Sequence, residues 1–102
     1  MYFVIAYGNR ALAHHYLAEY TQSIADNDIA TGLDPKYAGA YRNRGNAYAQ
    51  MGQHQQAIYD YDKAIELDPN DALAYRNRAI SYRKLGKPDL AEADEAKARE
   101  LD

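Results

Sequence analysis

The chain has 102 residues, a formal net charge of −3 at pH 7, 47% hydrophobic residues and 26% charged residues, which is the composition of one ordinary globular domain. The acidic balance argues against a general nucleic-acid-binding protein, and the lack of cysteine excludes a disulfide framework and a thiolate metal site. The sequence has no apolar run long enough for a membrane span and no basic start for a signal peptide, so we expect a cytoplasmic protein by default.

The sequence repeats itself with a period of 34 residues. Residues 33–68 match residues 67–102 at 18 of 36 aligned positions, and residues 3–35 match residues 37–69 at 13 of 33. A period of this length is typical of stacked helical hairpins, in which one supersecondary unit recurs along the chain. The three repeats occupy about 4–35, about 38–69 and about 72–102 of a single domain that spans 1–102.

Each repeat has the pattern of two helices joined by a short turn. In the second repeat, Tyr41, Gly45 and Tyr48 recur at helical spacing, and Gly52 then separates this helix from the next. Pro69 follows the second helix and cannot continue it. Read along the chain, the pattern predicts six helices, near 4–17, 20–32, 38–51, 54–67, 72–85 and 88–101. Because one hairpin cannot bury its apolar face alone, the hairpins are expected to stack.

The first repeat begins with an apolar edge that no preceding repeat covers. The edge consists of Tyr2, Phe3, Val4 and Ile5. Such an edge either folds back over the first hairpin or forms an interface, here between two copies of the chain as a homodimer. Farther along, Asn27 stands where the second repeat has Tyr61. A polar residue at this packing position predicts a looser, partly solvated second helix.

The second repeat resembles the tetratricopeptide repeat signature, in which small and aromatic residues alternate at fixed positions before a final proline. The residues that carry the resemblance are Tyr41, Gly45, Tyr48, Gly52, Ala57, Tyr61, Ala64 and Pro69. The resemblance extends over essentially the whole chain and is weakest in the first repeat. It implies an all-α fold, namely a right-handed α-solenoid of three hairpins and six antiparallel helices, whose first helices line a concave surface.

Polar side chains lie opposite the apolar stripe of these first helices and would therefore line the concave surface. The candidate peptide-binding residues are Asn9, Arg42, Asn43, Asn46, Gln50, Arg76, Asn77, Arg83 and Lys84. Asn9, Asn43 and Asn77 are spaced by 34 residues and would form a ladder along the groove. A carboxamide offers both a donor and an acceptor, so such a ladder can bind the main chain of an extended peptide.

The ladder resembles the asparagine ladder of the O-linked N-acetylglucosamine transferase and the peptide-binding asparagines of chaperone-docking tetratricopeptide domains. Arg42, Asn46 and Asn77 match part of the two-carboxylate clamp of the latter, with an arginine in place of a lysine. The resemblance implies a groove for an extended peptide. The basic residues of the fifth expected helix and its linker favour an acidic peptide.

Two further patterns recur with the repeat. Arginines on the first helices and aspartates on the second helices are expected to form inter-helix ion pairs with a structural role: Arg10, Arg44, Arg78, Asp26, Asp60, Asp94, Asp28 and Asp62. On the last helix, Glu92, Glu95 and Arg99 replace apolar residues of the preceding repeat. A terminal unit with a polar outer face keeps a repeat protein soluble, so the third repeat is predicted to act as the C-terminal cap. The alternative is a chain whose next helix is missing.

The sequence predicts neither catalysis nor a cofactor. Its histidines are His14, His15 and His54, and neighbouring helical residues point about 100° apart, which disfavours a shared metal ion. The tyrosines occupy core positions rather than a platform for stacking bases. Two functions remain: a protein–protein interaction scaffold that holds an extended peptide in its groove, and an assembly module that self-associates through the edge formed by Tyr2, Phe3, Val4 and Ile5.

Overall fold

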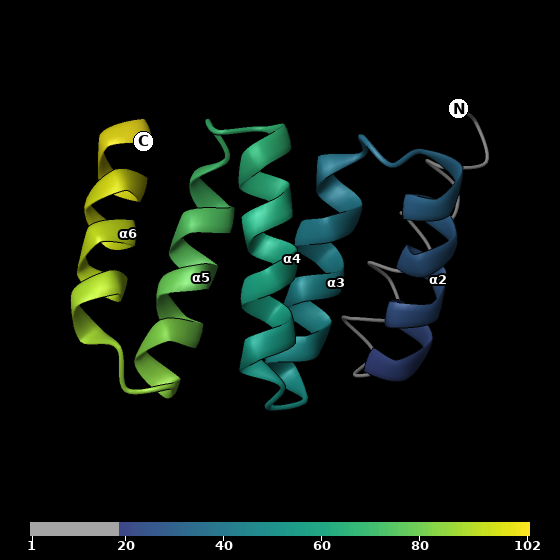
Figure 1. Cartoon of the computed structure of the whole chain (residues 1–102), viewed down its shortest axis with the longest axis horizontal. Helices are drawn as coiled ribbons and strands as arrows, with labels where there is room; N and C mark the ends of the chain where they lie inside the picture. The colour runs from purple at the N-terminus through teal and green to yellow at the C-terminus, as the bar shows by residue number, and fades with distance from the viewer. Residues whose placement is uncertain (1–18) are drawn as a thin grey trace.

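The computed structural model describes residues 19–102, which form a row of helices lying side by side (Figure 1). The helices are α2 (Tyr20–Leu33), α3 (Ala38–Gln50), α4 (His54–Leu67), α5 (Ala72–Lys84) and α6 (Pro88–Leu101). No strand occurs in this part of the chain. The bounds agree with the predicted ones to within one residue. The expected helix at 4–17 and the apolar edge at 2–5 lie outside the described residues.

Local sequence explains where the helices begin and end. Gly52 and Gly86 adopt φ angles of 78° and 73° in the turns that follow α3 and α5, a conformation that disfavours residues with a Cβ. The Asp71 carboxylate accepts a hydrogen bond from the Ala74 amide and so caps the start of α5. Pro88 begins α6, where its missing N–H would have no helical partner. The chain therefore turns back sharply after α3 and after α5, and each turn closes a hairpin.

Alanines make up most of the buried apolar residues in the described part of the chain, and Gly45 allows a close approach between α3 and α4. A Cβ on Gly45 would lie 2.8 Å from Cε1 of Tyr61 and 3.2 Å from the carbonyl oxygen of Ala57. Both residues belong to α4, and the Tyr61 side chain is almost fully buried. The absence of a side chain at Gly45 thus lets the Tyr61 ring pack directly against the backbone of α3.

We expect Gly45→Ala to lower the free energy of unfolding by about 1 kcal/mol. Overpacking against Tyr61 and the α4 backbone costs about 1–3 kcal/mol, which outweighs the helix-propensity gain of about 1 kcal/mol. Gly32→Ala is the matched control, because a Cβ at Gly32 of α2 meets nothing within 4 Å; it should raise stability slightly. Urea denaturation of both variants checks the pair, and a stabilising Gly45→Ala would contradict this packing.

Of two expectations about buried residues, one was met in part and the other was wrong. Tyr61 and Tyr75 are buried as predicted, whereas the other expected core tyrosines are half-buried: Tyr41, Tyr48 and Tyr82. The hydroxyl of Tyr41, for example, donates to the carbonyl oxygen of Pro35 at the surface. The prediction of a looser, partly solvated second helix was wrong at Asn27. Its side chain is fully buried, and its Nδ2 donates to the carbonyl oxygen of Ser23 one turn earlier on α2.

The recurring arginines and aspartates form the predicted ion pairs in the described repeats. Arg44 of α3 binds Asp60 of α4 through two hydrogen bonds of 2.9 and 2.7 Å, and its third nitrogen reaches Asp28 of α2 at 2.8 Å. Arg78 of α5 repeats this geometry with its own pair of aspartates, Asp94 and Asp62. Each arginine therefore joins its own hairpin to the preceding one.

The outer face of α6 is largely polar. Glu92 and Arg99 are exposed, as predicted, and Glu95 is half-buried in an ion pair with Arg83 at 2.6 Å. Ala96 stands 34 residues after Asp62, so α6 lacks the aspartate that would bind the arginine of a following hairpin. The role of the third repeat as a C-terminal cap stays a prediction.

Candidate functional site

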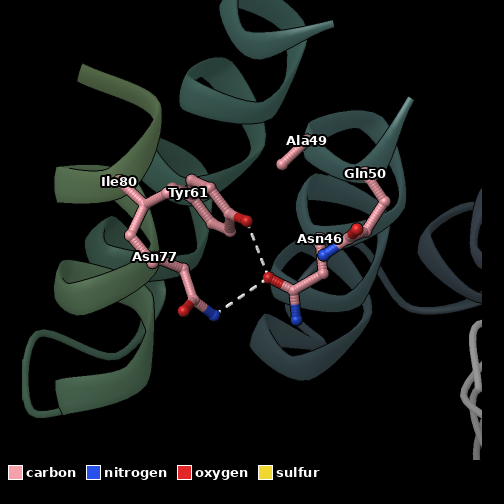
Figure 2. Close-up of a pocket in the computed structure, with 6 residues that line it drawn as sticks. All are labelled: Asn46, Ala49, Gln50, Tyr61, Asn77 and Ile80. Atoms are coloured by element: carbon pink, nitrogen blue, oxygen red, sulfur yellow. Dashed lines mark hydrogen bonds between the residues drawn. The ribbon is translucent and has the colours of Figure 1, made fainter. Parts of the chain in front are cut away.

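A cavity of about 220 Å³ opens between α3 and α5, with α4 forming its floor (Figure 2). We call it the α3–α5 groove and define it by its lining residues, Asn46, Ala49, Gln50, Tyr61, Asn77 and Ile80. Because α3 and α5 are the first helices of successive hairpins, the groove lies on the face for which the sequence predicted a polar stripe. Carboxamides and apolar side chains share this lining, so the groove can meet both main-chain and apolar groups.

A chain of hydrogen bonds crosses the groove and converges on Asn46 (Figure 2). The Tyr61 hydroxyl donates to Oδ1 of Asn46 at 2.7 Å, and Nδ2 of Asn77 donates to the same oxygen at 3.0 Å. Burial raises the pKa of the Tyr61 hydroxyl well above its ordinary value, and the neighbouring Asp60 carboxylate adds to the shift. The hydroxyl therefore keeps its proton throughout the neutral range and can act as a donor.

The structure brings three of the predicted site residues into one cavity, namely Asn46, Gln50 and Asn77. Asn43 is half-buried on α3 but does not line the groove. Asn9 lies outside the described residues, so the ladder of three asparagines is traced only at its second and third members. These two members differ, since Asn77 is hydrogen-bonded to Asn46 whereas Asn43 makes no side-chain hydrogen bond within residues 19–102.

Three of the predicted basic residues hold carboxylates of the chain itself. Arg42 pairs with Asp71 at 2.7 Å, Arg76 pairs with Asp102, and Arg83 pairs with Glu95. Lys84 is exposed in the last turn of α5. The Arg83 guanidinium holds the pKa of the Glu95 carboxyl below its ordinary value. An acidic ligand would therefore have to compete with these internal carboxylates for the arginines.

Sequence reasoning missed part of the groove lining. Ile80 is 53% exposed inside the groove, and its place 34 residues after Asn46 is the signal that could have identified it. Ala49 could have been identified because it lies three residues after Asn46, on the same face of α3. Tyr61 was expected in the core, where its ring does lie, but its hydroxyl also reaches Asn46. The 34-residue period assigns each residue to a face and does not show that a core tyrosine extends to the groove.

A second hollow, of about 430 Å³, lies on another face of the molecule and is lined by residues of α2, α3 and α4. Tyr59, which is 72% exposed, stands at this hollow beside Lys63 and Asp62.

Within residues 19–102, no three histidine, aspartate or glutamate side chains gather closely enough to hold a metal ion. In the same part of the chain, every helix is too short or too polar to cross a membrane.

The fold recurs in solved structures. MamA is 32% identical over 96% of this chain with a TM-score of 0.90, and the chain spans 57% of the MamA chain. The second TPR of Spaghetti (RPAP3), solved bound to the HSP90 peptide SRMEEVD, is 24% identical with a TM-score of 0.94, covering 97% of this chain and 92% of that one. The Arabidopsis OM64 TPR domain is also 24% identical, covers 97% of this chain and 82% of its own, and has a TM-score of 0.95.

Comparison of the sequence with curated proteins gave no match. Two models of tetratricopeptide repeat families match residues 38–71 and residues 60–93. Together these matches extend from residue 38 to residue 93, which is more than half of the 102 residues. The helical hairpins and the recurring small and aromatic residues agree with these matches. The chain therefore belongs to the tetratricopeptide repeat family.

Proposed function

We propose that this protein is an interaction scaffold that binds an extended peptide segment of a partner protein in the α3–α5 groove. The observation that carries the proposal is the groove itself, whose lining combines three carboxamides with the apolar surface of Ile80 and Ala49. Carboxamides can satisfy main-chain groups of a peptide, and the exposed side of Ile80 can bury an apolar side chain. A pocket with apolar walls and a few convergent polar groups is the usual form of a binding site.

The similar structures support a peptide ligand. The second TPR of Spaghetti (RPAP3) was solved with the acidic HSP90 peptide SRMEEVD bound, and it has the same fold. In this chain, Arg42 lies in the repeat that contributes Asn46, and Arg76 lies beside Asn77. We propose that these arginines favour acidic segments, with an attraction weakened by their pairing to Asp71 and Asp102.

We expect Asn77→Ala to weaken peptide binding about three- to tenfold, because one or two hydrogen bonds worth about 0.5–1.5 kcal/mol each are lost. Fluorescence anisotropy with labelled SRMEEVD as the probe measures the change. Asn70→Ala is the matched control, since Asn70 lies in the exposed turn before α5 and should leave affinity unaltered.

Added salt separates the electrostatic contribution of the arginines from the hydrogen-bond contribution of Asn77. Raising the ionic strength from about 0.05 M to about 0.5 M shortens the Debye length severalfold, so the arginine contribution should fade while the Asn77→Ala effect persists. If the Asn77→Ala variant bound the peptide as tightly as the original chain, the α3–α5 groove would not be the binding site. A variant that unfolds would instead assign Asn77 a structural role.

A further inference from the structure

The hydrogen bonds across the α3–α5 groove have a direction, and a single residue fixes it. Oδ1 of Asn46 accepts from both the Tyr61 hydroxyl and Nδ2 of Asn77. The Nδ2 group of Asn46 is therefore turned away from these two partners, and Oδ1 of Asn77 is turned away from Asn46, as Figure 2 shows. Asn46 thus offers N–H donors, and Asn77 offers an acceptor.

The reverse arrangement is disfavoured by Tyr61. If both carboxamides were flipped, Nδ2 of Asn46 would donate to Oδ1 of Asn77 and to the Tyr61 oxygen, and the two asparagines would still be bonded. The hydroxyl hydrogen of Tyr61 would then lose its acceptor, because Asn46 is the only hydrogen-bond partner of that hydroxyl within residues 19–102. The Tyr61 side chain is 1% exposed, so water cannot easily replace the acceptor, and an unsatisfied buried donor is costly.

We propose that the Tyr61 hydroxyl is a positioning group that orients Asn46 and Asn77, so that the groove presents a donor beside an acceptor to the edge of an extended main chain. This inference rests on the proposed function of the groove. Tyr61 acts through the two asparagines. Its role is to set which atoms face the ligand, in addition to filling space beneath Gly45.

The chemistry of the ligand follows from the paired donor and acceptor. In an extended chain, the N–H and C=O of one residue point toward the same edge, so one residue can accept from Asn46 and donate to Asn77. A carboxylate offers acceptors only and would face the oxygen of Asn77 unfavourably. A side-chain carboxamide could meet the same pair, but the probe SRMEEVD contains neither asparagine nor glutamine, so a side-chain carboxamide cannot account for its binding.

Two isosteric substitutions with the same charge test the direction. Asn46→Asp keeps an oxygen that accepts from Tyr61 and Asn77 but removes the donor that faces the ligand. Asn77→Asp keeps the acceptor toward the ligand but removes the donor to Asn46. Each places one negative charge in the same groove, so repulsion of SRMEEVD is shared. We expect Asn46→Asp to weaken binding about tenfold more than Asn77→Asp, and Asn77→Asp to be the less stable variant. Equal losses of affinity, or the opposite order, would overturn the proposal.

Amide hydrogen exchange in the full, ligand-free chain tests the orientation without a ligand. We expect one side-chain N–H of Asn77 to be protected from exchange and both side-chain N–H groups of Asn46 to exchange rapidly. Tyr61→Phe should reduce this difference and weaken SRMEEVD binding about threefold to tenfold, with little change in ring packing. Protection of Asn46 instead of Asn77 would overturn the inference even if the peptide binds. The expected protection together with no binding to the unmodified chain would overturn the proposed function and, with it, the main-chain selection.

Discussion

Replacing Arg44 with methionine is expected to lower the free energy of unfolding by about 3–5 kcal/mol, because removal of one partner leaves a buried charge unpaired. Asp60 is 1% exposed and receives two hydrogen bonds from the Arg44 guanidinium. Urea denaturation followed by circular dichroism measures the loss. Arg83→Met is the matched control, since its partner Glu95 is half-exposed and surface pairs contribute little.

The Arg44→Met effect should depend on pH in a defined direction. Burial already raises the pKa of the Asp60 carboxyl, and the Arg44 guanidinium opposes that shift. Without Arg44, the folded chain holds the Asp60 proton more tightly than the unfolded chain does. The destabilisation caused by the unpaired Asp60 is therefore smallest below the ordinary pKa of an aspartate, and it grows as the pH rises through the raised pKa of the folded state. A loss under about 1 kcal/mol at neutral pH would contradict the role given to this pair.

Truncating Tyr61 to alanine should have an effect of similar size, about 3–5 kcal/mol, because a large aromatic side chain is removed from a close-packed site. The ring packs against Gly45, and its hydroxyl orients Asn46. Tyr59→Ala is the control, since Tyr59 on the same helix is 72% exposed and its loss should alter stability by no more than about 0.5 kcal/mol. Denaturant midpoints that fall equally for the two variants would contradict the packing described for Tyr61.

Helix positions and ion-pair partners could be predicted from the sequence because they follow the period. Residues spaced by 34 occupy equivalent sites, so the arginine at position 44 and the aspartate at position 60 recur as Arg78 and Asp94 with the same geometry. Turn glycines and prolines then limit the helix ends to within a residue. This part of the prediction depends only on backbone geometry and on which face each residue occupies.

The groove could be predicted only in part, because the period does not determine where a long side chain ends. Arg42 was expected to face a ligand, and the period could not show that its guanidinium also binds Asp71, the residue that caps the next helix. Ile80 breaks the polar pattern set by Asn46 and so was left out of the site. Burial of Asn27 was missed because its carboxamide can bond the carbonyl of Ser23 on its own helix, a partner that packing patterns do not reveal.

The central claim is that the α3–α5 groove holds a peptide, and a nuclear magnetic resonance titration of the isotope-labelled chain with SRMEEVD tests it most directly. The account predicts saturable shifts of the backbone amides of Asn46, Ala49, Asn77 and Ile80, with the amides around the Tyr59 hollow unchanged. Two results would contradict this claim. One is a set of shifts confined to the Tyr59 hollow. The other is the absence of saturable shifts up to about 1 mM peptide, since a Kd of about 1 mM corresponds to a binding free energy of about −4 kcal/mol.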